Sequence, residues 1–600
     1  MVDARNPTPS DTSASAEPKR QLPPVLDKLS PLEEAVIDAA RRGTWVQPGA
    51  TLAAGDLIAA EDLGLRVRAD LIRELLMGRR GELDPQGVLI RGVRVIGRLN
   101  LDHLTAVTGV ALVDCALPDG ITCQQARLHQ VSVSSSVIFS LNAENVRIDG
   151  HFLMSDARIT GSSEDGALRL AGAHIGGKLD LDGVTITDTT GPALDADGIR
   201  IDSDLLVRSA RITGSSEDGA FRLVGAHIGG YLNLDGVTIT NTTGPALHAD
   251  DVRTNSNLFL RDARITGTGE RGAFRLIGAH ISSQLDLDGV IITNIAGPAL
   301  VADGIRIDNH VFLRNAHITG AGEKGALRLP GSHSGGQAHL TGTQVTNESG
   351  PLVMLSEAQV IQQPLFFSAA LVCPQSRREV VNRPCPDGAR RMVVRGFVFT
   401  QLRDVTWREW LHLLVHHTPE YLPQPYQQLA AVERAAGHDN NARTILITQQ
   451  HDLRRRAPDA LGGSLARARH WLWGWLGHYG YRAHRLVTAL LIALILAGAT
   501  GYTAGQITTR PTHHTAERVQ SPTTPATAPG IPCSTAELIG LGIDRGLPVG
   551  ATGLRARCDL DTTTRRGQAF TYLLWALQAL LWALATLTIA AYTGLIRKTT

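Results

Sequence analysis

Aromatic residues and cysteines are both scarce in this sequence. Phe, Trp and Tyr make up 4% of its 600 residues, whereas glycine alone accounts for 61. The six cysteines form no C-x-x-C pair, so the spacing of a zinc ribbon or a thioredoxin-like redox site is missing. The formal net charge is only +1, which gives no reason to expect a nucleic-acid partner or an acidic substrate. This composition favours a fold built from turns and small apolar positions.

Catalytic motifs are missing as well. The sequence contains no P-loop, no G-x-S-x-G and no H-E-x-x-H. We therefore predict no catalytic residue, no bound cofactor and no metal site. Residues 1–25 lack the apolar segment of a signal peptide, and their Pro, Ser, Thr and charge predict a disordered tail. The large N-terminal part is therefore expected in the cytoplasm.

An internal repeat of 53 residues dominates the middle of the chain. The segment GALRLAGAHIGGKLDLDGVTIT starts at Gly166, and close copies start at Gly219, Gly272 and Gly325. Each period contains a shorter unit, L-x-L-x-G-A-x-I, and two such units form a coil of 26 or 27 residues. Coils of this kind resemble the pentapeptide-repeat class. We predict a mainly β fold, a right-handed quadrilateral (pentapeptide-like) β-helix solenoid over 86–372, with double-coil repeats over 141–350.

Aligned repeats place charged residues in columns on the outer wall. One column alternates acid and base and is expected to fix the register between coils; it comprises Asp182, Arg208, Asp235, Arg261, Asp288 and Arg314. A second column alternates Arg and His and is a candidate stripe for an anionic partner; it comprises Arg147, His174, Arg200, His227, Arg253, His280, Arg306 and His333.

Two other interpretations of these repeats are less favoured. Histidines of the second column recur in every second coil, about 9–10 Å apart, which is too far for ligands of one metal ion. The segments 267–272 and 320–325 match G-x-G-x-x-G, but a strand pattern follows each of them. A dinucleotide site needs a helix there, so we interpret both segments as corners of the solenoid.

The remaining cysteines and histidines form pairs along the chain. We interpret His416–His417 and His513–His514 as surface histidines, and Cys373 and Cys385 as buried or free cysteines. Cys533 and Cys558 lie in a segment between two hydrophobic stretches, where an outward-facing location would allow a disulfide. The sequence leaves that disulfide open.

Segments on both sides of the solenoid predict helices. Ser30-Pro31-Leu32-Glu33 is a capping box that starts a helix, and a second helix ends at Gly78. Together they predict a helical cap over 26–85. Downstream we predict, in order, an irregular cap (373–423), a helical hairpin with a juxtamembrane segment (424–485), a transmembrane helix (486–505), an extracytoplasmic loop (506–568) and a second transmembrane helix (569–596).

Several segments resemble a known group of proteins. They are VRADLIRELLMG (67–78), GVLIRGVRVIGRLNLDHL (87–104), the repeated coils, PYQQLAAVERAAGHDNNA (425–442) and WLWGWLGHYGYRAHR (471–485). Together they resemble actinobacterial proteins labelled membrane-associated oxidoreductases. The resemblance implies a membrane-attached solenoid and redox chemistry, with no catalytic motif to carry over.

The sequence therefore supports two main functional hypotheses. The first is a non-enzymatic scaffold on a bacterial cell membrane, with the solenoid and the C-terminus in the cytoplasm. Its expected partners are the lipid bilayer and an unidentified protein, and no nucleic acid is expected. The second hypothesis is an oxidoreductase, which rests on the resemblance. A third possibility is sensing of envelope stress through the cysteines of the loop.

Overall fold

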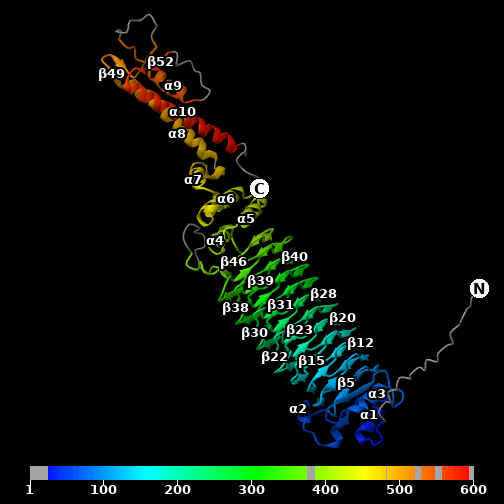
Figure 1. Ribbon diagram of the computed structural model, residues 1–600. Helices are drawn as coiled ribbons and strands as arrows, with labels where there is room; N and C mark the ends of the chain where they lie inside the picture. Colours follow the sequence, from blue (N-terminus) through cyan, green and yellow to red (C-terminus); the bar gives the residue numbers. More distant parts are fainter. Residues whose placement is uncertain (1–24, 375–384, 482, 520–528, 548–556, 593–600) are drawn as a thin grey trace, which may run out of the picture. The chain divides into compact units, whose positions relative to one another are not determined.

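The computed structural model describes residues 25–374, 385–481, 483–519, 529–547 and 557–592 (Figure 1). The chain divides into two compact units, Met1–Pro419 and Glu420–Thr600. The first unit contains the solenoid, and the second is built mainly from helices.

The first unit is a parallel β-solenoid with four long sheets of 12, 12, 11 and 13 strands. One coil shows the plan: β15 (Leu168–Arg169), β16 (His174–Ile175), β17 (Leu179–Asp180) and β18 (Thr185–Thr187) each belong to a different sheet. We name the four sheets after these strands. Every strand pairs in parallel with the equivalent strand of the next coil, as the 53-residue period predicts. The predicted solenoid is thus confirmed.

Side chains along each short strand alternate between inward and outward positions, and the inward apolar ones fill the interior of the coil. In the coil above, Leu168, Ile175, Leu179 and Ile186 are at most 1% exposed. The chain turns between strands through left-handed residues, such as Gly172 (φ 66°) and Gly183 (φ 67°). A side chain is rarely accommodated in that conformation, which explains the recurrent Gly of the repeat.

Asparagine side chains hold the longer corners of the double coil. The Asn294 side-chain amide donates to the carbonyl oxygens of Gly269 (2.8 Å) and Pro298 (2.7 Å), and Asn241 and Asn347 make equivalent bonds. Asn294 is 1% exposed, so these bonds satisfy carbonyl groups that water does not reach. The G-x-G-x-x-G segment 267–272 lies at such a corner, between β30 (Arg264–Gly267) and β31 (Phe274–Arg275). A strand follows it, as the sequence predicts.

Helices lie at the N-terminal end of the solenoid. Helix α1 (Pro31–Arg42) begins at the predicted capping box, and α3 (Ala69–Leu76) ends just before Gly78. Glu33 is buried at 3% exposure and pairs with Arg68 at 2.7 Å. Burial of Glu33 opposes its ionisation, yet hydrogen bonds from Arg68 and Ser30 outweigh that effect and lower its pKa.

The C-terminal end of the solenoid differs from the prediction of an irregular cap over 373–423. Strands β46 (Met392–Val393), β47 (Val398–Phe399) and β48 (Leu402–Arg403) add a further coil. Helix α4 (Trp407–His416) follows, and its Trp410 is 1% exposed. The Trp410 ring lies 5.1 Å from Phe367 and 5.4 Å from Phe399, so α4 covers apolar side chains of the last coils.

The second unit begins with the helical hairpin α5 (Pro423–Ala435) and α6 (Asp439–Arg456). Tyr426 and Arg456 meet the buried Asp452 between the two helices. Helix α7 (Ser464–Gly477) then leads to α8 (Ala483–Gln506). Helices α9 (Thr535–Gly546) and α10 (Arg565–Tyr592) complete the unit.

Two of these helices are long and apolar enough to cross a membrane. They contain the segments His484–Gln506 and Arg565–Ala590, and only 28% and 22% of their most apolar windows are buried inside the protein. The core helix of a soluble protein would be mostly buried. Large apolar side chains instead lie exposed, among them Ile495 (71%) and Ile589 (65%).

Helix α9 packs against both long helices, in a region predicted only as a loop. A Cβ atom on Gly542 would lie 2.1 Å from the Ala497 carbonyl oxygen, and one on Gly501 would lie 2.3 Å from the Leu538 carbonyl oxygen. These glycines therefore allow α8 and α9 to approach closely. Leu538 and Leu541 of α9 join Ala504 and Leu574 in one apolar cluster.

Candidate functional site

The acid–base column forms ion pairs between neighbouring coils. Arg208 donates from its guanidinium to Asp182 and Arg261 donates to Asp235, each at 2.5 Å, and Arg314 pairs with Asp288 in the same way. Each Asp also accepts the backbone N–H of its Arg partner, at 2.7–2.8 Å. The pairs are half-exposed, so each one stabilises the fold by only about 0–1 kcal/mol. Because the same pairing recurs every 53 residues, these ion pairs are suited to fixing the register between neighbouring coils.

The Arg/His column lies at one position of the β16 sheet. Its eight members pair in register from Arg147 to His333. Aspartates flank part of it: Asp202 lies 2.9 Å from His174, and Asp308 lies 2.9 Å from both His280 and Arg306. The hydrogen bond from His174 lowers the pKa of Asp202, and those from Arg306 and His280 lower that of Asp308. This part of the stripe is therefore less basic than its Arg and His content suggests.

The coil between these two aspartates differs. The position equivalent to Asp202 and Asp308 is Asn255, so the stretch that holds His227 and Arg253 lacks that negative charge. Arg253 is exposed on the outer wall. The stripe is thus most basic at its centre.

The β15 sheet carries a third set of charged residues, which was not predicted from the sequence. Arg222, Arg275 and Arg328 of the β15 sheet pair with Asp197, Asp250 and Asp303 of the preceding coil. The signal was present in the sequence, since these arginines recur every 53 residues in GAFRL and GALRL.

An open groove lies near the N-terminal end of the solenoid. It has a volume of about 840 Å³ and is lined by residues that include Trp45, Val107, His129 and Asp149. Trp45 is 42% exposed and Val107 is 53% exposed. Its lining mixes apolar side chains with polar ones such as Thr108 and Gln130.

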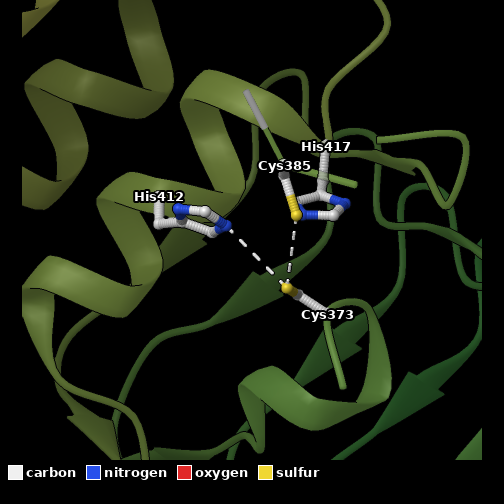
Figure 2. A group of neighbouring side chains, drawn as sticks. All are labelled: Cys373, Cys385, His412 and His417. Atoms are coloured by element: carbon white, nitrogen blue, oxygen red, sulfur yellow. Dashed lines mark hydrogen bonds between the residues drawn. The ribbon is translucent and has the colours of Figure 1, made fainter. Parts of the chain in front are cut away.

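Two cysteines and two histidines converge beside helix α4 (Figure 2). The Sγ atoms of Cys373 and Cys385 lie 3.7 Å apart, and Cys373 Sγ lies 3.8 Å from His412 Nε2. One ligand atom from each of these residues and from His417 lies within 4.8 Å of all the others. Cys373 and His417 are fully buried, and His412 is 3% exposed.

The fold positions each member of this Cys/His cluster. Cys373 follows the short helix η2 (Ala369–Leu371), and His412 lies in the middle of α4. His417 is the C-cap of α4, where φ −117° and ψ 8° end the helix. His417 Nδ1 lies 2.7 Å from the Arg390 carbonyl oxygen, so this nitrogen donates its proton there. Its other nitrogen, Nε2, is buried without a hydrogen-bond partner.

The cluster corrects the interpretation of His417, which is fully buried and not a surface histidine. The interpretation of the two cysteines is confirmed, since Cys373 is buried and no disulfide joins it to Cys385, and the structure adds the histidines beside them. Burial lowers the pKa of His417, which favours the neutral imidazole. The sequence-based interpretation rested on the adjacent pair His416–His417, so His412 was missed. The spacing H-x4-H from His412 to His417 was the available signal.

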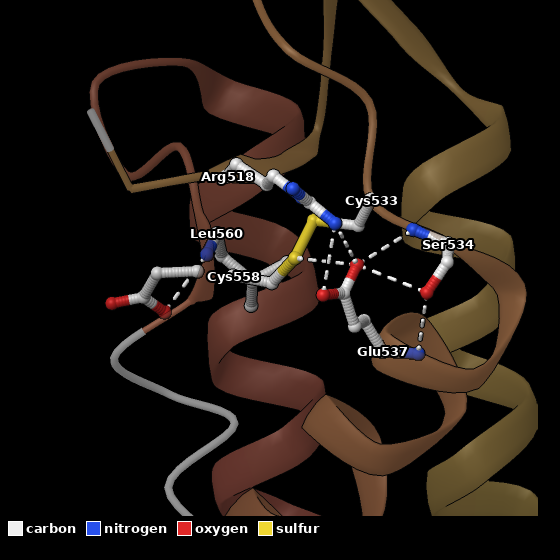
Figure 3. Close-up of a disulfide and its surroundings, with 7 residues drawn as sticks. Arg518, Cys533, Ser534, Glu537, Cys558 and Leu560 are labelled. Atoms are coloured by element: carbon white, nitrogen blue, oxygen red, sulfur yellow. Dashed lines mark hydrogen bonds and ion pairs between the residues drawn. A yellow bond between two sulfur atoms is a disulfide. The ribbon is translucent and has the colours of Figure 1, made fainter.

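The second unit holds Cys533 and Cys558 in a disulfide, with Cα atoms 6.4 Å apart (Figure 3). Nearby, Ser534 caps α9 and exchanges hydrogen bonds with Glu537. Arg518 reaches the same carboxylate at 3.1 Å. The Ser534 backbone hydrogen bond lowers the pKa of Glu537. This arrangement joins three segments of the region between α8 and α10.

The pair His513–His514 is half-buried in the short strand β50 (His513–His514) of this region. His513 Nδ1 lies 3.2 Å from the Glu517 carboxylate, which is an acidic neighbour that the sequence analysis overlooked.

The fold and sites described above define a β-solenoid joined to two long apolar helices. No family model, curated protein or solved structure matches this chain.

Proposed function

We propose that this chain is a membrane-anchored scaffold whose solenoid presents a repeated outer wall to a protein partner. The observation that carries the proposal is the exposed apolar surface of α8 and α10, on the same chain as the regular solenoid. Apolar helices of this length are stable in the hydrocarbon region of a bilayer, where their exposed side chains contact lipid.

The distribution of charge and cysteine supports a cytoplasmic location for the solenoid. Arg454, Arg455 and Arg456, with Arg467 and Arg469, precede α8, and basic residues favour the cytoplasmic side. The region between α8 and α10 holds the disulfide, which suits an oxidising compartment. Cys373 and Cys385 of the first unit lie 3.7 Å apart and are not joined by a disulfide, which suits the reducing cytoplasm.

The centre of the Arg/His stripe is the part of the wall best suited to an acidic protein surface. His227 and Arg253 are adjacent there, and Asn255 replaces the aspartate found in the flanking double coils. An acidic partner would gain favourable charge pairs without displacing an existing one.

Crosslinking with mass spectrometry on membranes tests this proposal. A deletion of residues 166–324 removes three complete 53-residue periods and joins Asp165 to Gly325, which is equivalent to Gly166. The shortened solenoid is expected to lose partner crosslinks that the full chain makes. An identical partner list for both proteins would show that the repeated wall is not the binding surface.

Two point variants then separate the sheets. Arg253→Glu reverses a charge on the β16 sheet, and Arg211→Glu does the same at an exposed position of the β18 sheet. We expect Arg253→Glu to reduce the yield of partner crosslinks several-fold more than Arg211→Glu does. Equal effects would place the partner away from the stripe.

A further inference from the structure

We propose that Cys373, Cys385, His412 and His417 bind one Zn²⁺ ion in a closed structural site at the C-terminal end of the solenoid. This inference goes beyond the scaffold proposal, because it concerns how the last coils are held together. Its test does not depend on a protein partner of the solenoid.

The distances match the requirements of tetrahedral zinc. With Zn–S bonds of about 2.3 Å and Zn–N bonds of about 2.0 Å, tetrahedral angles place two sulfurs about 3.8 Å apart and a sulfur and a nitrogen about 3.5 Å apart. The two cysteine sulfurs lie 3.7 Å apart, and Cys373 Sγ lies 3.8 Å from His412 Nε2. All four ligand atoms lie within 4.8 Å of one another, so a contraction of at most about 1.5 Å between any two of them completes the tetrahedron.

The hydrogen bonds around the site orient a ligand for the metal. Because His417 Nδ1 donates to the Arg390 carbonyl, the lone pair of the ring is on Nε2, the buried atom without a partner. Metal-bound histidines in proteins show this arrangement almost always. Arg390 is itself fixed, since its guanidinium donates to the carbonyl oxygens of Val372 (2.9 Å) and Leu371 (3.0 Å).

The charges of the proposed site also balance. Each cysteine binds as a thiolate and releases its proton to solvent, so two thiolates and two neutral imidazoles offset the charge of Zn²⁺. A neutral centre suits this position, where Cys373, His412 and His417 are almost completely buried.

Other roles for the four residues fit the structure less well. A disulfide requires sulfurs about 2.05 Å apart, well below the 3.7 Å between Cys373 and Cys385. A catalytic cysteine must reach its substrate, but Cys373 is fully buried. Four protein ligands leave no open coordination position for substrate, so the site is structural.

The metal would join three parts of the chain that are distant in sequence. Cys373 follows the coil that ends near residue 371, Cys385 precedes the last coil, and the two histidines belong to α4 and its cap. The Met392 backbone N–H donates to the His417 carbonyl oxygen at 2.7 Å, which connects that last coil to the same cap. Zinc would therefore hold α4 against the end of the solenoid.

The metal content of the full-length protein tests this inference. The chain, purified in detergent without chelators, is expected to contain one zinc ion per chain by elemental mass spectrometry. After exchange with Co²⁺ it should show the visible absorption of a tetrahedral site with sulfur ligands. Protein without zinc that also gives no tetrahedral Co²⁺ spectrum would overturn the proposal, as would a Cys373–Cys385 disulfide in the protein from cells.

A matched pair of histidine variants identifies the ligands. His417→Gln is expected to lower the zinc content and the tetrahedral Co²⁺ absorption at least tenfold. His416→Gln changes the adjacent residue, whose ring lies 4.7 Å from that of His412 but which is not one of the four ligands, and should retain both. Equal zinc content in the two variants would contradict the assignment. If the His417→Gln protein does not fold, the Co²⁺ spectrum of the unmodified chain still tests the proposal independently.

Discussion

Phe274→Ala is expected to lower the free energy of unfolding of the solenoid by about 3–5 kcal/mol, the range for a large aromatic residue lost from a core. Phe274 is fully buried in β31, where it pairs in register with Leu247 and Leu300 of the neighbouring coils. The narrow interior of a coil has few side chains that can move into the resulting cavity. Urea unfolding of the full chain in detergent, followed by circular dichroism, measures the change.

Phe312→Ala provides the matched control for this prediction. Phe312 lies half-exposed on the β17 sheet, stacks on His339 at 5.3 Å and has the Arg314 guanidinium 5.0 Å above its ring. Loss of these contacts should cost about 1 kcal/mol. A strand shifted by one residue would exchange inner and outer positions. Equal or reversed effects of the two variants would therefore contradict the register of the solenoid.

Cys533→Ser is expected to destabilise the region between α8 and α10 by about 3–4 kcal/mol, because the disulfide closes a loop of 25 residues. The effect should be local, since the disulfide lies beside the α9 cap and the apolar cluster of Leu538 and Leu541. Hydrogen exchange of α9 amides in the full chain measures the loss of protection.

The double variant supplies the control for this experiment. Removal of either cysteine breaks the same bond, so Cys533→Ser, Cys558→Ser and the double variant should destabilise α9 by nearly the same amount. Additive effects, or unchanged exchange after reduction, would show that the disulfide does not stabilise this region.

The solenoid could be predicted from the sequence because each coil repeats the same environment. Leu168, Leu194 and Phe221 occupy the same position in successive coils, and the apolar requirement there recurs with the period. The last coil was missed for a physical reason. Its β46 pairs Met392 with Val353, 39 residues earlier, so the intervening residues break the period that revealed the other coils.

The H-x4-H spacing could have indicated the two histidines, but the complete Cys/His cluster could not be predicted from the sequence, for a related reason. Its members come from three segments that only the last coil and α4 bring together. Cys373 and Cys385 are 12 residues apart, whereas the paired cysteines of common zinc-binding motifs are separated by only two or three residues. Helix α9 was missed because Gly540, Gly542 and Gly546 lower its helix propensity. The structure explains two of these glycines by tertiary packing, since Gly542 lies against the Ala497 carbonyl of α8 and Gly546 lies against Leu581 of α10.

The orientation of the chain in the membrane is the most direct test of the account as a whole. Protease is added to right-side-out spheroplasts and, separately, to inverted membrane vesicles that contain the full chain with an N-terminal tag. The membrane-anchored scaffold predicts that the chain stays in the membrane after alkaline extraction and that protease releases a resistant solenoid fragment only from inverted vesicles. Release of the solenoid from spheroplasts, or extraction of the intact chain by alkali, would contradict it.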